Sequence, residues 1–274
     1  MNIHKISART ITILILTCSF FLSVLPFYWL LISAVKPASE IFSKPSFIPE
    51  KITLENFGQL FSKTMFLRNI YNSIIIASFY AASGVIICSM AGFGLAKYPS
   101  RIKKFVFALV IAALLIPSSV LVVPIFILVT KFHIANTYQG IILPFLANSF
   151  GVFWMNQYIS GVPNELLQAA RIDGAGDLRI YSNILLPAIR PGIAALAIFL
   201  FMQQWNDFLW PLVVLSTENM YTIPIALSML KGVYSMQWGQ LMAGAAISVL
   251  PFVVLFILLQ KYFIAGILAG SLKG

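Results

Sequence analysis

Long apolar runs alternate with short polar segments along almost the whole chain. Charge-free stretches cover residues 10–35, 69–96, 105–130, 134–164 and 232–260, and a sixth run, residues 191–217, contains a single charge, Asp207. Since a helix needs about 20 apolar residues to cross a bilayer, each run is long enough to span a membrane. We expect helices in these runs, because an open strand cannot satisfy its backbone polar groups in lipid.

The pattern therefore predicts an all-α, polytopic membrane protein with six transmembrane helices. We expect an N-terminal segment at residues 1–9, a first transmembrane helix at 10–35, an external loop at 36–68, a transmembrane core at 69–264 with a polar loop at 161–190, and a tail at 265–274. A cleaved signal peptide is the alternative for the first run. Its apolar region would cover only about 7–15 residues, so we favour an uncleaved span.

The composition supports a membrane protein. Of 274 residues, 60% are hydrophobic and 9% are charged, whereas a soluble domain carries about 25% charged residues. The net charge of +10 would suggest nucleic acid as the partner of a soluble protein. Here the basic residues lie between apolar runs, where they orient membrane proteins, so we expect contact with membrane lipid and no nucleic acid.

The distribution of basic residues predicts the orientation. Eleven Lys and Arg residues fall on the side of the N-terminus and seven on the other side, and residues 97–104 hold four of them without an acid. Because cytoplasmic segments are enriched in Lys and Arg, we expect both termini and the loop 161–190 to be cytoplasmic. Residues 36–68 and 218–238 would then be external.

Residues that commonly bind metals or catalyse reactions are scarce. Cys18 and Cys88 lie inside apolar runs, and His4 and His133 are far apart, so neither a disulfide nor a metal site is indicated. The chain has no Gly-Lys dipeptide and therefore no phosphate-binding loop for ATP. We expect no catalytic residue and no cofactor, and any ATP hydrolysis would be the work of another polypeptide.

Residues 163–187 form a polar segment between two apolar runs, and this segment is the most informative part of the sequence. Pro163 and Asn164 predict a helix start, and Glu165 stands in the first turn, where the helix dipole favours an acid. Gly174 interrupts this helix, and Asp173 is a candidate cap of the next one. The segment is too polar to cross the membrane.

Two apolar stripes are expected in this segment. The first combines Leu166, Ala169 and Ala170 at helical spacing, and the second continues through Leu178, Tyr181 and Leu185 towards Pro187. An amphipathic connector lying on the membrane surface is one interpretation of these stripes.

The spacing within the segment indicates a second interpretation. Gln168, Ala169 and Ala170 are followed after three residues by Gly174, and nine residues later by Ile184, Leu186 and Pro187. This resembles the signature loop of binding-protein-dependent ABC import permeases of type I: Glu-Ala-Ala, three residues, Gly, nine residues, Ile-x-Leu-Pro. The leading Glu is Gln168 here, and Glu165 is the candidate to replace its charge.

The resemblance implies that residues 163–187 are a coupling helix seated in a cleft of a separate ATPase. It assigns this role to Glu165, Gln168, Ala169, Ala170, Asp173, Gly174, Ile184, Leu186 and Pro187.

Further segments are similar to the carbohydrate branch of these permeases. They are Lys36-Pro37, residues 53–57, Asn72-Ser73, residues 205–211, and residues 266–274, which resemble the tail of the smaller maltose-importer permease subunit. The resemblance implies import of a sugar or oligosaccharide across a bacterial cytoplasmic (inner) membrane. It further implies a second permease subunit, two copies of an ABC ATPase and an extracytoplasmic solute-binding protein as partners.

Asp207 is the main candidate for the translocation path, because an acid inside a span is functional by default. It follows Arg190 by 17 residues, about 26 Å at a rise of 1.5 Å per residue, which predicts a position near the outer mouth. Asn206 is its neighbour, and Asn148 and Asn156 are weaker candidates. Alternatively, Asp207 only accompanies an interfacial aromatic belt.

Three other functions remain open at this point. An importer of glycerol phosphate, peptide or another small solute fits the same resemblance. A second alternative is an ion-coupled secondary transporter, which would require paired intramembrane charges and an inverted repeat, whereas Asp207 is the one charge inside a run. A third is a membrane scaffold without transport, which would not need the signature loop.

Overall fold

The computed structural model describes residues 3–43, 46–232 and 237–271, and all regular elements in these ranges are helices. The predicted all-α class is therefore confirmed. The chain divides into two compact units. The first consists of Met1–Phe66 with Ala226–Leu250, and the second of Leu67–Ile225 with Pro251–Gly274.

The first unit begins with a long apolar helix, α1 (Ile3–Ala34). In Arg9–Ala34 the most apolar window is entirely unburied, as expected for a helix that faces lipid or another chain. After α2 (Glu40–Ser43) and α3 (Glu55–Lys63), the unit is completed by the first half of α15 (Trp238–Ser271).

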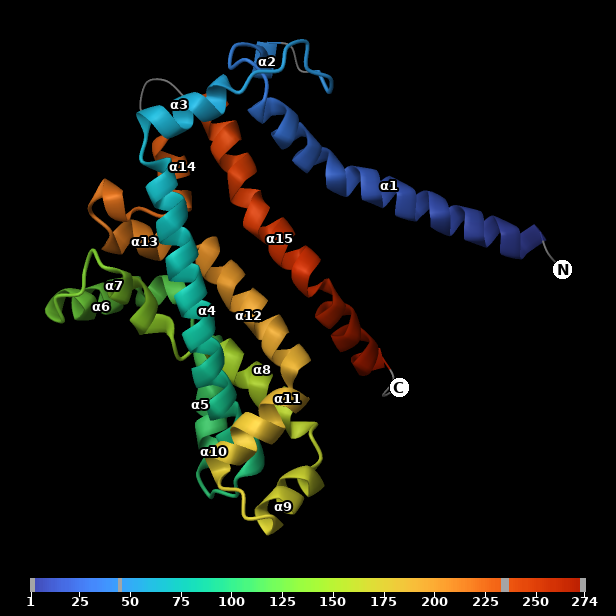
Figure 1. Cartoon of the computed structure of the whole chain (residues 1–274), viewed down its shortest axis with the longest axis vertical. Coiled ribbons are helices and arrows are strands. Elements are labelled where there is room, and N and C mark those ends of the chain that lie inside the picture. The colour runs from blue at the N-terminus through green and yellow to red at the C-terminus, as the bar shows by residue number, and fades with distance from the viewer. Residues whose placement is uncertain (1–2, 44–45, 233–236, 272–274) are drawn as a thin grey trace. The chain divides into compact units, whose positions relative to one another are not determined.

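The second unit is built around α4 (Phe66–Lys97), whose first residue belongs to the first unit. It is followed in this unit by α5 (Lys103–Leu114), α6 (Ser118–Lys131), α7 (Tyr138–Ile142), η1 (Leu143–Phe145), α8 (Ser149–Ser160), α9 (Asn164–Ile172), α10 (Asp177–Ile180), η2 (Tyr181–Leu185), α11 (Leu186–Ala188), α12 (Arg190–Trp205), α13 (Leu209–Val214), η3 (Glu218–Met220) and the start of α14 (Ile223–Met229). The last four residues of α14 belong to the first unit. Within this unit, α9 and α10 lie near one end of α4, and α6, α7 and α13 lie towards the other (Figure 1).

Three of the six expected spans are long single helices. Arg9–Ala34, Phe66–Lys97 and Trp238–Leu255 are long and apolar enough to cross a membrane, and two bent helix pairs pass the same test together. The chain is thus a multi-pass membrane protein. The tail predicted at 265–274 continues α15 as far as Ser271, and residues 272–274 lie outside the described residues.

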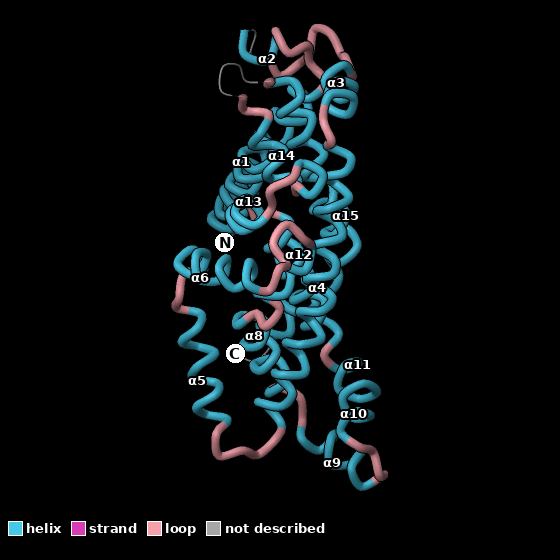
Figure 2. Tube along the Cα trace, turned by 90° about the vertical axis from the view of Figure 1, so that its left-hand side faces the viewer, coloured by secondary structure: helices cyan, strands magenta, loops and turns pink. Residues whose placement is uncertain are grey.

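The other three expected spans are helical as predicted, but each contains a break. Residues 105–130 form α5 and α6, bent by 102° at Pro117 (Figure 2). Residues 134–164 are divided before α8, and residues 191–217 are divided between α12 and α13. Each break has a local cause. Pro117 lacks a backbone N–H and so interrupts the helical hydrogen bonds before α6. Asn148 caps α8 by accepting a hydrogen bond from the Gly151 N–H at 2.9 Å, and Asp207 accepts a hydrogen bond from the Trp210 N–H, at 3.4 Å, in the first turn of α13.

The core of the second unit depends on a close approach of α4 and α8. A Cβ atom added at Gly92 would lie 2.7 Å from Cβ of Met155, a separation that real atoms do not adopt. Small residues allow such crossings in membrane helices. The buried cluster around this crossing includes residues of the loop 163–187, among them Leu167, Ala170, Ile180 and Leu185.

Candidate functional site

Residues 163–187, here called the signature loop, fold as two short helices joined at Gly174. The N–H of Gly174 donates to Arg171 O at 3.0 Å, and the N–H of Ala175 donates to Ala170 O at 2.9 Å. Together with the positive φ of Gly174, +77°, these bonds form a Schellman motif that ends α9. The predicted helix start at Asn164 and the interruption at Gly174 are both confirmed.

The predicted cap of the second helix is wrong. Asp173 is the C-terminal cap of α9, whereas α10 begins after Gly176 without a side-chain cap. The reason is that the glycine turn takes two further residues before the chain becomes helical again.

The signature loop is fastened to the end of α4. The Lys97 ammonium donates to Val162 O and to Asn164 Oδ1. The guanidinium of Arg171 lies 5.3 Å from the ring centre of Tyr98. Burial raises the pKa of the Tyr98 phenol and the Asp177 carboxylate adds to this rise, whereas the Arg171 guanidinium opposes it.

A further contact joins the second half of the loop to α4. The hydroxyl groups of Tyr181 and Ser89 are hydrogen-bonded at 2.7 Å, and the Tyr181 ring lies 5.9 Å from that of Phe93. Tyr181 opens a short π-helical turn, Tyr181–Leu185, a rare element that often marks functional sites. The second half of the loop is thus attached to α4 by a hydrogen bond and a ring contact.

The loop exposes three large apolar side chains among its polar residues, but not in the stripes that were predicted. Leu166, Ile172 and Leu178 are 49%, 87% and 74% exposed, whereas Leu167 and Ala170 are buried. The predicted first stripe thus mixes two faces of α9, and Leu178 does not share a face with the buried Leu185. Because Leu167 and Ala170 fill the core beneath the loop, the helix is turned so that Leu166, Ala169 and Ile172 face outward.

The nine predicted coupling residues divide between the two faces. Ala170 is buried, and Ile184 and Leu186 are half-buried against the core. The remaining six are exposed or lie in the turn: Glu165, Gln168, Ala169, Asp173, Gly174 and Pro187.

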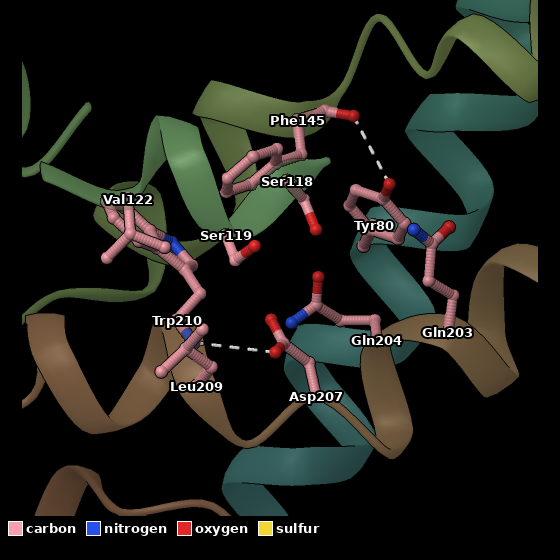
Figure 3. Close-up of a pocket in the computed structure, with 10 residues that line it drawn as sticks. All are labelled: Tyr80, Ser118, Ser119, Val122, Phe145, Gln203, Gln204, Asp207, Leu209 and Trp210. Carbon is pink, nitrogen blue, oxygen red and sulfur yellow. Dashed lines mark hydrogen bonds between the residues drawn. The ribbon is translucent and has the colours of Figure 1, made fainter. Parts of the chain in front are cut away.

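A cavity of about 220 Å³ lies in the second unit, at the place where the three broken spans meet (Figure 3). We call it the break pocket. Ser118 and Ser119 reach it from the start of α6, Phe145 from the end of η1, and Asp207 from the link between α12 and α13. Its other lining residues are Tyr80, Val122, Gln203, Gln204, Leu209 and Trp210.

Of the four residues predicted for the translocation path, Asp207 alone lines the break pocket. Asn148 lies beside it and donates to Tyr80 Oη and to Gln203 Oε1, both at 3.1 Å. Asn156 is buried in α8 near the Gly92 crossing, and Asn206 is exposed and donates to Met202 O of its own helix.

Sequence reasoning missed most of the pocket. Tyr80, Ser118, Ser119, Gln203 and Gln204 were not selected, although the last four are polar residues inside apolar runs. That signal could have identified them.

A protein-family model described as "Binding-protein-dependent transport system inner membrane component" matches residues 84–268 of the chain. The chain belongs to this family. The matched region contains the whole signature loop and every lining residue of the break pocket except Tyr80.

Several curated relatives of this permease extend over almost its full length. An arabinooligosaccharide transport permease, AraQ, of Halalkalibacterium halodurans is 38% identical, over 93% of this chain and 92% of the relative. The melibiose/raffinose/stachyose import permease MelC of Bacillus subtilis is 34% identical, over 98% of each. The lactose transport permease LacG of Rhizobium radiobacter is 31% identical, over 94% of each.

Solved structures share the fold. A chain of a bacterial ABC transporter involved in import of the acidic polysaccharide alginate matches with a TM-score of 0.84 at 19% identity, over 96% of this chain and 99% of the other. A second structure, of an alginate transporter in complex with an alginate pentasaccharide-bound periplasmic protein, matches with a TM-score of 0.67 at 17% identity, over 93% of each chain.

Two segments that resemble the carbohydrate branch have structural roles in this permease. The Asn56 amide donates to Ala34 O and Lys36 O at 2.9 and 2.7 Å, which fixes α3 to the end of α1. Asn72 donates to Asn219 O and Tyr221 O, both at 2.9 Å, and Ser73 accepts from the Ile223 N–H at 2.9 Å. Asn72 and Ser73 lie near the start of α4, whereas the signature loop is fastened to its end at Lys97.

Proposed function

We propose that this permease imports neutral saccharides by alternating access and is driven by a separate ATPase that grips the signature loop. The exposed apolar face of that loop carries the proposal. Leu166, Ile172 and Leu178 would be costly to leave in water on a polar loop, and a covering protein would remove that cost.

The contacts of the loop suit transmission of force. Lys97, Tyr98 and Ser89 tie it to α4, and α4 contributes Tyr80 to the break pocket. ATP-driven approach of the two ATPase subunits would move each loop, and the helix attached to it would open the path outward. Two ATPase copies, a second permease chain and an extracytoplasmic solute-binding protein complete the proposed assembly.

The three relatives named above support a neutral saccharide as the solute, since their names all refer to uncharged sugars. Asp207 in the break pocket argues against glycerol phosphate, because an anion would meet a carboxylate there.

Two isoleucines in polar segments test ATPase docking as a matched pair. Ile172 is 87% exposed on the signature loop, and Ile102 is 66% exposed just before α5. Ile172→Glu should abolish co-purification of the ATPase in detergent, whereas Ile102→Glu should leave it near the parental level. Equal retention of the ATPase by both variants would contradict docking on the signature loop.

The proposed orientation, with both termini and the signature loop cytoplasmic, has its own test. After replacement of Cys18 and Cys88, a cysteine at Ser43 should react with an impermeant thiol reagent in intact cells. A cysteine at Ser100 should react only in opened cells. The reverse pattern would leave the signature loop on the side without ATP and would rule out the docking.

A further inference from the structure

The break pocket presents polar groups that helices of a membrane protein normally hide. Three helix breaks meet there, and at membrane depth irregular backbone is tolerated where it is buried in protein or lines a cavity. Transporters place substrates at such discontinuous helices. The start of α6 adds backbone N–H groups, because Pro117 offers no side-chain cap.

One buried donor in the pocket, the amide nitrogen of Gln204, has no hydrogen-bond partner among the described residues. Gln204 is only 7% exposed, yet its amide Nε2 makes no hydrogen bond to any of the described residues. In Figure 3 this amide points into the cavity, between the carboxylate of Asp207 and the hydroxyl of Ser118. A buried donor without an acceptor is unfavourable, so a native structure that retains one calls for an explanation.

The neighbouring polar groups are held in place. Tyr80 donates to Phe145 O at 3.2 Å and accepts from Asn148. Asn148 also binds Gln203, and Asp207 is held by the Trp210 N–H. The pocket is therefore pre-organised around the free amide of Gln204.

The chemistry of the lining selects an uncharged, hydroxyl-bearing ligand. The Gln204 amide donates, the Asp207 carboxylate accepts, and the serine hydroxyls do either. Phe145 and Trp210, whose rings pack edge to face with centres 5.4 Å apart, supply an apolar wall for the face of a sugar ring. The cavity volume of about 220 Å³ is below the roughly 300–1,000 Å³ of pockets that hold drug-sized ligands, so it suits one sugar ring.

We propose that the break pocket binds a single ring of a neutral saccharide, with the Gln204 amide donating to one ring hydroxyl and Asp207 accepting from another. This rests on the proposed import of neutral saccharides. It adds that this subunit itself holds the sugar, through Gln204, Asp207 and the two serines at the start of α6.

The test uses the complete transporter, reconstituted with its ATPase, second permease and solute-binding protein. Uptake of labelled lactose, raffinose and arabinotriose is measured first, and the sugar that the parent takes up fastest is followed with its monodeoxy analogues. Gln204→Leu removes the amide at similar volume, and Gln139→Leu is the control, since Gln139 is exposed on α7 outside the pocket.

Gln204→Leu should raise the KM for uptake about threefold to tenfold, the usual size of a neutral hydrogen bond, while Gln139→Leu stays parental. One monodeoxy analogue should lose affinity in the parent but not in Gln204→Leu, because its missing hydroxyl is the partner of the amide. Gln204→Glu keeps the shape of the side chain but replaces the hydrogen-bond donor with an acceptor, so it should also raise the KM. This second variant replaces Gln204→Leu in the test if Gln204→Leu does not assemble into the transporter.

Two results overturn the proposal in distinguishable ways. If the parent takes up saccharides and the Gln204 variants keep its KM or lose affinity equally for every analogue, the pocket does not bind sugar and the proposed function stands. If the parent takes up none of the three sugars, the saccharide function itself fails, and the pocket proposal fails with it.

Discussion

The signature loop and the break pocket place side chains in opposite ways. The loop exposes Leu166, Ile172 and Leu178 although it lies in a polar segment. The pocket buries Gln204 and half-buries Asp207 inside apolar runs. Each arrangement is unfavourable in the isolated chain, and each becomes favourable when a partner of the right chemistry covers it: an apolar protein surface for the loop, and a hydroxyl-rich solute for the pocket.

The largest expected effect follows from the turn of the signature loop. Gly174→Leu should reduce uptake to background although the protein still reaches the membrane. A side chain at φ +77° costs about 1–2 kcal/mol and would deform the turn beneath the docking face. Sugar uptake into vesicles measures transport, and immunodetection of the permease in the same membranes measures how much of it is inserted.

Two variants separate turn geometry from side-chain volume. Gly174→Asn should retain part of the uptake, because Asn tolerates a positive φ. Gly176→Leu should retain most, since Gly176 has φ −73° and open space around its Cα. Parental uptake by Gly174→Leu would show that the turn is dispensable for coupling.

An intermediate effect, on thermal stability, is expected at the crossing of α4 and α8, because this crossing supports both the signature loop and the break pocket. Gly92→Val places side-chain atoms against Met155, and overpacking of this kind costs about 1–3 kcal/mol. The midpoint of thermal unfolding in detergent should therefore fall. Gly94→Val is the control on the same helix, because no atom lies within 4 Å of a Cβ at Gly94, and it should leave the midpoint unchanged. An equal fall in both variants would mean that the crossing of α4 and α8 is not the critical contact.

The smallest effect, on ATPase affinity, is expected at Glu165, the candidate to replace the acid that the signature has at the position of Gln168. Glu165→Ala should weaken ATPase association about tenfold if its carboxylate pairs with a base of the ATPase, a bond worth about 1–3 kcal/mol. Gln168→Glu added to this variant should restore much of the loss. Titration of the purified permease with the ATPase measures both affinities.

An internal partner offers the competing explanation of Glu165. Its charge interacts with Lys97, which fastens the loop to α4. Unchanged ATPase affinity in Glu165→Ala would leave Glu165 with this internal role and with the favourable position at the helix start.

The signature loop was predictable because its information is contiguous. Spacing within 25 residues gave the helix start at Asn164 and the turn at Gly174. Its buried face was not predictable, because α9 is short and the choice between Leu166 and Leu167 as the inward residue depends on a core supplied by α4 and α8.

Most of the break pocket could not be predicted, because its residues are scattered along the sequence. Tyr80, Ser118, Phe145 and Gln204 come from four separate runs, and one sequence carries no signal of which runs meet. Asp207 was found because a charge in an apolar run is conspicuous. The helix breaks at Pro117 and Asn148 were missed because run length alone predicts continuous spans.

Energy coupling can be measured most directly in proteoliposomes that contain the permease, the second permease chain and the ATPase, with the solute-binding protein outside. Labelled lactose, raffinose or arabinotriose is offered with ATP or ADP enclosed and no ion gradient. We expect accumulation of at least one sugar with ATP, none with ADP, and none with ATP when the permease carries Ile172→Glu. Accumulation that needs an ion gradient and not ATP, or that persists unchanged in Ile172→Glu, would contradict an ATPase-driven importer gripped through residues 163–187.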